Sequence, residues 1–169
     1  MEKSLELYSL GYDKVKTYIV ACAFAVGNIV LPQLFHLIPK GGMIFLPIYF
    51  FTLVGAYKYG WKVGLLTAFL SPVANSLLFG MPTLAVLPAI LLKSVLLALG
   101  AGFVASRCRK ATLLLLTAVV LAYQVAGTMG EWAICRDFAL AVQDFRIGLP
   151  GMALQVVGGW IVINKILRK

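Results

Sequence analysis

Long apolar segments follow one another along this chain, and they constrain its fold more than any other feature. Six can be delimited, at about 17–38, 43–57, 63–79, 83–105, 111–130 and 147–164. A helix needs roughly 20 apolar residues to cross the hydrocarbon core of a bilayer. Hydrophobic residues make up 62% of the chain and charged residues only 12%, which leaves too few polar side chains to cover a soluble globule. The sequence therefore predicts an all-α integral membrane protein, a compact bundle of six transmembrane helices in which residues 1–169 form a single domain.

Two of the segments, 43–57 and 63–79, are short for a hydrocarbon core about 30 Å thick, and Pro47 and Pro72 interrupt them. Each can be tilted, broken or partly re-entrant, and the sequence leaves these alternatives open. The stretch 57–62 between them places aromatic rings and cations where a membrane interface is expected. We predict a tight hairpin at a membrane surface there.

Basic residues concentrate in the connections on one side of the predicted bundle. Since loops rich in Lys and Arg stay in the cytoplasm, both termini are predicted to be cytoplasmic. The net charge of +9 is split among four short pieces and forms no contiguous basic face, so we expect no nucleic-acid binding. Eleven of the fifteen basic residues belong to this side: Lys3, Lys14, Lys16, Lys58, Lys62, Arg107, Arg109, Lys110, Lys165, Arg168 and Lys169.

Catalytic motifs are missing from the sequence. It contains no Walker A loop, Rossmann fingerprint, HExxH motif or nucleophile elbow. Cys22, Cys108 and Cys135 have neither metal-ligand nor redox spacing, and we predict that they are free thiols. We therefore expect a protein that is not an enzyme and has no metal site and no cofactor. The energy for any pumping would have to come from a partner chain or an ion gradient.

Lys93 is the only charged side chain deep inside an apolar segment. A lysine at the centre of a membrane helix costs roughly 2.5–3.5 kcal/mol, so its charge needs a partner, a water-filled cavity or a bound anion. The placement favours a binding site for a small anionic or carboxylate-bearing nutrient, with Lys93 as the counter-charge. An internal pair with Glu131 is the alternative, and a substrate then need not be anionic.

Other polar side chains fall in the outer halves of the predicted spans and complete a predicted substrate site. Gln124 and Glu131 are seven residues apart and therefore share one helical stripe. Asn and Gln side chains in membrane helices also bond neighbouring helices, so a packing role stays open for each of them. The predicted site consists of Lys93, Asn75, Gln124, Tyr49, His36, Glu131 and Gln155.

The outer connection between Glu131 and Arg146 carries apolar side chains at roughly helical spacing. This pattern predicts an amphipathic helix lying on the membrane surface. Because the connection adjoins the predicted site, the helix is either a lid or a plain interfacial helix.

Glycines and prolines punctuate the chain in a recurring pattern. It consists of the run 42–49 (Gly-Met-Ile-Phe-Leu-Pro-Ile-Tyr), Gly55, Gly60, Gly64, Ser71-Pro72, the run 79–83 (Phe-Gly-Met-Pro-Thr) and Leu87-Pro88. This pattern resembles that of the substrate-binding S components of energy-coupling factor (ECF) transporters. The resemblance covers nearly the whole chain. An Ala-x-x-x-Ala pair in the first helix, used in that family to dock on the coupling subunit, is matched by Ala21 and Ala25.

The resemblance implies a substrate-capture subunit in a bacterial or archaeal cytoplasmic membrane. Such subunits bind a vitamin or other small nutrient from outside, under the loop that joins the first two helices, here residues 38–42. They then reorient in the lipid bilayer against a coupling transmembrane subunit that two ATPase subunits drive. The missing Walker motif is expected in that arrangement, because ATP is hydrolysed in the partner chains.

A second interpretation comes from another class of protein. A membrane scaffold of similar size, such as an MreD-like rod-shape morphogenesis protein, would use the same polar residues for helix packing and would bind no small molecule. A closed, fully packed outer half with Lys93 paired internally favours the scaffold. An open cavity that reaches Lys93 favours the transporter. A membrane enzyme is the third interpretation, but the spans lack a paired acid and nucleophile.

Overall fold

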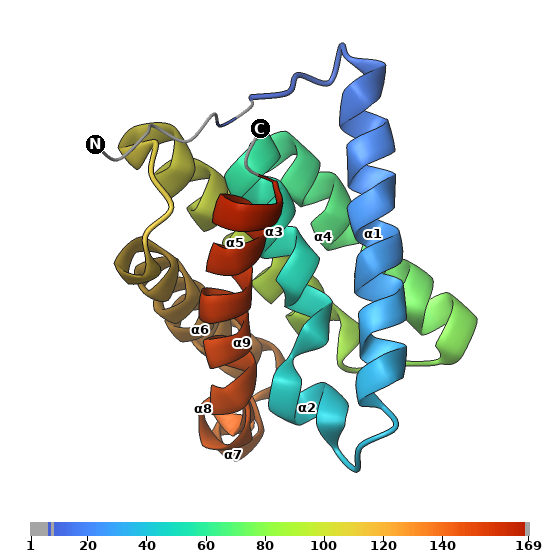
Figure 1. Ribbon diagram of the computed structural model, residues 1–169. Coiled ribbons are helices and arrows are strands. Elements are labelled where there is room, and N and C mark those ends of the chain that lie inside the picture. The colour runs from blue at the N-terminus through green and yellow to red at the C-terminus, as the bar shows by residue number, and fades with distance from the viewer. Residues whose placement is uncertain (1–6, 8, 168–169) are drawn as a thin grey trace.

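The computed structural model describes residue 7 and residues 9–167, and this part of the chain is helical, with no strand (Figure 1). Five of its helical segments are long and apolar enough to cross a membrane, so by length and composition the chain is a multi-pass membrane protein. The predicted all-α membrane class is confirmed. The five are α1 (Val15–Phe35), α4 (Trp61–Phe79), α5 (Leu87–Cys108), α6 (Leu113–Cys135) and α9 (Leu149–Ile161) with its π-helical continuation η2 (Val162–Ile166). Lys3, Arg168 and Lys169, which contribute to the predicted orientation, lie outside the described residues.

The second predicted span is broken into three pieces, α2 (Gly41–Phe45), η1 (Pro47–Tyr49) and α3 (Phe50–Tyr59). Leu46 ends α2 in a left-handed conformation with φ of 46°, and Pro47, which follows, has no N–H with which to continue the helix. At about 1.5 Å per residue, α3 measures about half the thickness of a bilayer core. The structure therefore has five long apolar helices where six were predicted, and the interruption expected at Pro47 is confirmed. The interruption expected at Pro72 is wrong, because α4 continues as one helix through that proline.

The short helix α3 is the most enclosed element of the bundle. It contacts α1, α4, α5 and α9, which surround it in Figure 1. Burial on several sides explains how a broken segment is stable here, since its polar backbone ends are covered by protein instead of lipid. Its buried residues are Phe50, Thr52, Leu53, Val54, Gly55, Ala56, Tyr57 and Lys58.

A tight hairpin joins α3 to α4 through the single residue Gly60, as predicted. Its φ of 101° is open to glycine and strained for other residues. Protein covers the aromatic and the cation that precede the turn, since Tyr57 and Lys58 are each 1% exposed. Lys62, after the turn, lies over the Tyr12 ring at 5.1 Å from its centroid. The bundle interior therefore begins two residues before the turn.

A proline in α1 creates a polar link between three helices. Pro32 has no N–H, so the carbonyl of Asn28 one turn earlier loses its helical donor. Asn75 Nδ2 of α4 donates to that carbonyl at 2.9 Å. The Asn28 side chain donates to Thr52 Oγ1 of α3 at 3.0 Å and accepts from the Phe51 N–H at 2.9 Å. These bonds fix α1, α3 and α4 relative to one another.

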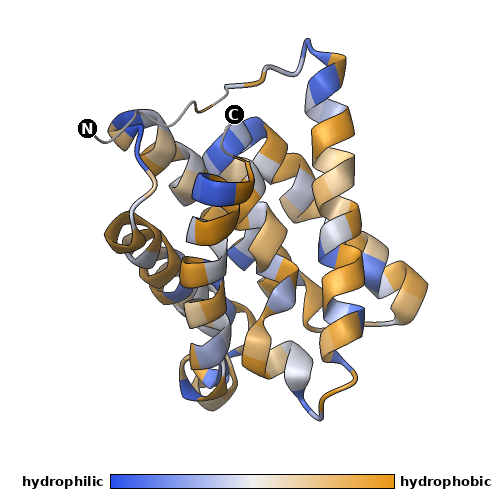
Figure 2. Cartoon of the chain, viewed as in Figure 1, coloured by the Kyte–Doolittle hydropathy of each residue, from blue (hydrophilic) through white to orange (hydrophobic). Residues whose placement is uncertain are grey.

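The outer surface of the bundle is apolar. Large side chains such as Leu77 and Leu114 are exposed along the long helices. Hydrophobic residues predominate along the helices, and hydrophilic residues gather mainly toward their ends and in the connections (Figure 2). So extended an apolar surface is unfavourable in water and suits contact with lipid.

Hydrogen bonds tie together segments at one end of the bundle. The Leu10 N–H donates to the Tyr59 carbonyl at 3.1 Å, and Asn164 Nδ2 donates to the Ala111 carbonyl at 2.9 Å. The elements α2, α7 (Phe138–Ala141) and α8 (Gln143–Ile147) gather at the opposite end (Figure 1). The candidate functional site lies at that second end.

Candidate functional site

A cavity of about 600 Å³ opens among the elements that gather at this end of the bundle. Most of its wall is apolar, and its polar groups come from α4, α5, α6, α8 and the loop after α1. Cavities of several hundred Å³ with a mostly apolar wall and a few placed polar groups are typical of small-molecule sites. The residues that line it are Pro32, His36, Ile38, Pro39, Lys40, Gly41, Gly42, Met43, Leu46, Pro47, Ile48, Tyr49, Asn75, Met81, Pro82, Thr83, Val86, Ala89, Ile90, Lys93, Glu131, Leu140, Gln143 and Asp144.

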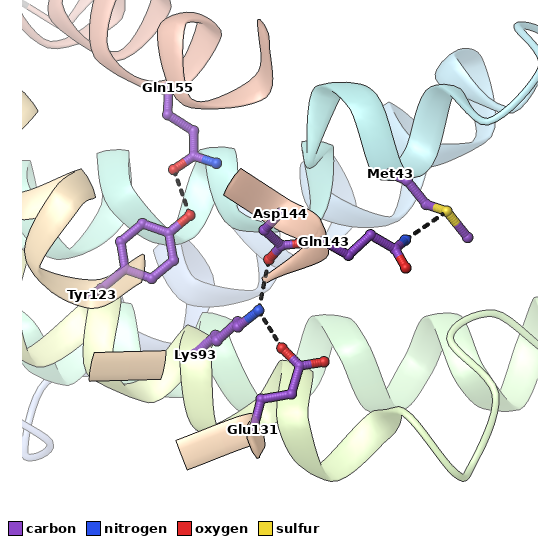
Figure 3. Close-up of polar contacts among 7 residues, drawn as sticks. All are labelled: Met43, Lys93, Tyr123, Glu131, Gln143, Asp144 and Gln155. Carbon is purple, nitrogen blue, oxygen red and sulfur yellow. Dashed lines mark hydrogen bonds and ion pairs between the residues drawn. The ribbon is translucent and has the colours of Figure 1, made fainter. Parts of the chain in front are cut away.

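Lys93 of α5 lies between two carboxylates in the wall of this cavity (Figure 3). Its Nζ is 2.5 Å from Glu131 Oε2 of α6 and 2.7 Å from Asp144 Oδ2 of α8. The side chains of Lys93, Glu131 and Asp144 are 3%, 11% and 17% exposed. We call these three residues the Lys93 cluster. Internal partners thus balance the charge of the buried lysine, and the excess carboxylate gives the ionised cluster a net charge of −1.

Gly127 makes room for the lysine on α6. A Cβ atom added there would lie 2.5 Å from Lys93 Cγ and 3.4 Å from its Cδ, so a larger residue would displace the lysine stem. Glu131 follows one helical turn after Gly127 and therefore projects from the same face of α6. Gly127 leaves space for the stem of Lys93, and Glu131 binds its ammonium group. The same face of α6 therefore contacts both parts of the lysine side chain.

Two short helices, α7 and α8, replace the single amphipathic helix predicted for the connection after α6. Asp137 begins α7 by accepting a hydrogen bond from the Leu140 N–H at 3.1 Å, which is the usual role of an aspartate N-cap. The helix ends at Val142, whose backbone leaves the helical region with ψ near 3°. This break is a turn that positions the following α8 against the cavity.

The start of α8 closes one side of the cavity. Gln143 Nε2 lies 3.0 Å from Met43 Sδ of α2, across the cavity wall (Figure 3). The next residue, Asp144, reaches Lys93. Adjacent residues of α8 therefore contact α2 and α5, which is the geometry of a cover over the site.

Five of the seven predicted substrate-site residues line the cavity: Lys93, Asn75, Tyr49, His36 and Glu131. The other two, Gln124 and Gln155, are fully buried in the bundle and are not among the lining residues. Gln155 Oε1 accepts a hydrogen bond from the Tyr123 hydroxyl at 2.9 Å (Figure 3). The ring of Tyr123 in turn packs on that of Tyr49 at 5.6 Å, so Gln155 supports the cavity wall from behind.

Asn75 presents an unpaired acceptor at the cavity. Its Nδ2 donates to the carbonyls of Asn28 at 2.9 Å and Ser71 at 3.1 Å, which fixes the orientation of the amide. The residue is 2% exposed, and its Oδ1 has no hydrogen-bond partner among the described residues. An unpaired buried acceptor costs about 1–3 kcal/mol, so a donor brought by a ligand would be favourable here.

The predicted docking pair is not on the outer face of α1. Ala21 is fully buried and Ala25 is 6% exposed. The carbonyl of Ala21 accepts from Thr67 Oγ1 of α4 at 3.4 Å, and its side chain packs with Val63. In the described conformation these small residues bring α1 and α4 together, and their role in docking a partner stays a prediction.

Asp144 is a member of the Lys93 cluster that the sequence pattern did not single out. It lies 51 residues from Lys93, in a connection outside the predicted spans. One signal was available: the chain has only six acidic residues, and Asp144 is one of three in its second half, all between Glu131 and Asp144. A carboxylate is one kind of partner that a buried lysine can have, so the acidic residues of this connection were candidates to pair with it.

The fold and the site together define a class: an all-helical, multi-pass membrane protein with a cavity next to a buried ion cluster. Comparison of the chain with models of protein families, with curated proteins and with solved structures finds no match. The resemblance to S components therefore rests on the sequence pattern alone, and function has to be argued from the site.

Proposed function

We propose that this protein is a membrane-embedded capture subunit for a small nutrient, of the kind found in ECF transporters. The observation that carries the proposal is the cavity of about 600 Å³ that reaches a charged cluster inside a bundle of membrane helices. A helix bundle that only had to pack would fill such a volume with side chains, since protein interiors are close-packed. Asn75 also lines the cavity, and its buried Oδ1 has no hydrogen-bond partner among the described residues.

The elements around the cavity suit capture from one side of the membrane. The loop after α1, with His36 and Lys40, lies along one side, and α8 lies along another. The contact between Gln143 and Met43 joins α8 to α2, and opening of α8 would also separate Asp144 from Lys93. We propose that the loop and α8 open to admit the nutrient and close over it.

In this proposal the broken segment α2–η1–α3 counts as a sixth crossing, and both chain ends face the cytoplasm. The cavity then opens to the outside. Transport inward requires a coupling transmembrane subunit and two ATPase subunits, because the chain has no nucleotide-binding motif of its own. The nutrient is a vitamin or another small metabolite.

The experiment is to purify the protein alone in mild detergent and to analyse the denatured sample by mass spectrometry. A small metabolite present at about one mole per mole of protein supports capture and names the substrate. Thermal unfolding with a panel of vitamins and precursors provides the second measurement, because a ligand that binds only the folded state raises the melting temperature. If no compound co-purifies and none in the panel stabilises the protein, the capture function is refuted.

A scaffold without a small-molecule substrate is the second candidate, and one observation favours it. Glu131 and Asp144 compensate Lys93 within the chain, so the lysine needs no bound anion. A scaffold would be recognised by a membrane protein that co-purifies with it in stable stoichiometry, while the ligand experiments above give nothing.

A further inference from the structure

Charge around the cavity is unevenly distributed. The Lys93 cluster carries two carboxylates against one ammonium and is largely buried, so its excess negative charge is weakly screened. Lys40 also lines the cavity, but it is exposed in the loop after α1, where water and salt screen it. The enclosed part of the site therefore carries a net negative charge, and the ammonium group of Lys93 is already paired with two carboxylates.

One hydrogen-bonding side chain of the cavity wall, that of Asn75, also favours a ligand that donates. Asn75 uses both N–H groups of its amide on backbone carbonyls, which leaves Oδ1 as the group without a partner. A carboxylate ligand would find no free donor in this amide, and it would face the carboxylates of Glu131 and Asp144. A ligand with N–H donors would satisfy Asn75 and complement the excess charge.

The remaining wall fits an apolar body. Prolines, methionines and branched side chains make up most of it, including Pro39, Met43, Ile48, Met81, Val86 and Ile90. Such a wall excludes water from a bound molecule and strengthens charge interactions at its polar end.

We infer that the cavity takes a cationic ligand, a compound with a protonated amine or a positively charged nitrogen heterocycle on an apolar body. The cationic nitrogen lies beside Asp144 and Glu131, and an N–H group of the ligand donates to Asn75 Oδ1. This inference rests on the proposed capture function and names the chemical class of its substrate. A cationic ligand thus takes the place of the anionic nutrient that the sequence position of Lys93 alone predicts.

Three probes of the same ring and chain length test the charge preference: phenethylammonium, the anion hydrocinnamate and the neutral phenethyl alcohol. Their binding to the purified protein in lipid nanodiscs is measured by equilibrium dialysis. We expect phenethylammonium to bind at least about tenfold more tightly than the other two, since charge complementarity at a buried site governs specificity.

The variant Asp144→Asn should reduce that preference to less than about threefold, because the cluster then has no net charge. Asp137→Asn is the matched control: it makes the same change in the same connection, outside the cavity wall, and asparagine also caps helices. It should leave the preference unchanged. Circular dichroism establishes that both variants fold.

Three outcomes would overturn the inference: equal binding of the three probes, tighter binding of hydrocinnamate, or a preference for phenethylammonium that survives Asp144→Asn. None of them would refute the capture function. If no probe binds but a metabolite co-purifies, that metabolite is passed over a cation exchanger at neutral pH. Its retention supports the inference and its elution in the flow-through overturns it. If no probe binds, nothing co-purifies and no compound of the vitamin panel stabilises the protein, the inference and the capture function both fail.

Discussion

Replacing Lys93 by methionine tests the ion cluster most directly. The substitution keeps the length of the apolar stem and removes the ammonium that lies 2.5 and 2.7 Å from the two carboxylates. Breaking a buried ion pair by removing one partner costs about 3–5 kcal/mol. Because Glu131 and Asp144 are 11% and 17% exposed, some of their charge is solvated, and we expect the lower end of that range. A loss of about 3 kcal/mol changes the unfolding equilibrium more than about a hundredfold.

The assay is unfolding by SDS titration in mixed micelles, followed by the fluorescence of the three tryptophans. A triple variant, Lys93→Met with Glu131→Gln and Asp144→Asn, removes the unpaired charges and should recover about 2 kcal/mol, since replacing a whole buried ion cluster is often nearly neutral. Lys14→Met, at an exposed position, is the control and should change the free energy of unfolding by less than about 0.5 kcal/mol. A loss below about 0.5 kcal/mol for Lys93→Met, or a triple variant as unstable as the single one, would refute the cluster as a stabilising element.

Two further predictions concern packing around the site, both measured by the same unfolding titration. Gly127→Ala places a methyl group against the stem of the buried lysine and should cost about 1–3 kcal/mol, while Gly100→Ala, with open space at its Cβ, should be neutral or stabilising by up to about 1 kcal/mol. Equal effects of the two substitutions would contradict the close contact. Asn75→Leu leaves the carbonyl of Asn28 unpaired and should cost about 1–3 kcal/mol. Pro32→Ala restores the helical N–H to that carbonyl, so in this background Asn75→Leu should cost about 1 kcal/mol less, and additive effects would show that the two residues are not linked.

The chain's membrane character was predictable because it depends on local composition. Apolar runs of about 20 residues have few alternatives to a helix in lipid, where each backbone polar group needs a partner within its own segment. The interruption at Pro47 was predictable for the same reason, since a proline removes a donor wherever the chain goes. The sequence left open whether the second segment was tilted, broken or re-entrant, because burial of α3 by four other helices is a tertiary property.

The candidate site shows where sequence reasoning was limited. Lys93, Asn75, Tyr49, His36 and Glu131 were predicted to share one cavity, and they line it. Helical periodicity placed each polar side chain on a face, but it did not tell which faces meet. Gln124 and Gln155 lie on faces that pack inside the bundle, away from the cavity.

The sequence by itself determined that the chain enters the membrane, that its second apolar segment is interrupted at Pro47, and that Lys93 is the costly residue around which a site would form. Each of these follows from the free energy of transferring particular side chains and backbone groups into lipid, which depends on the residue and its immediate neighbours. The tertiary structure decided the sign of the charge at the site. Asp144 reaches Lys93 only because α7 and α8 turn back over the bundle, and a contact across 51 residues depends on how the helices assemble.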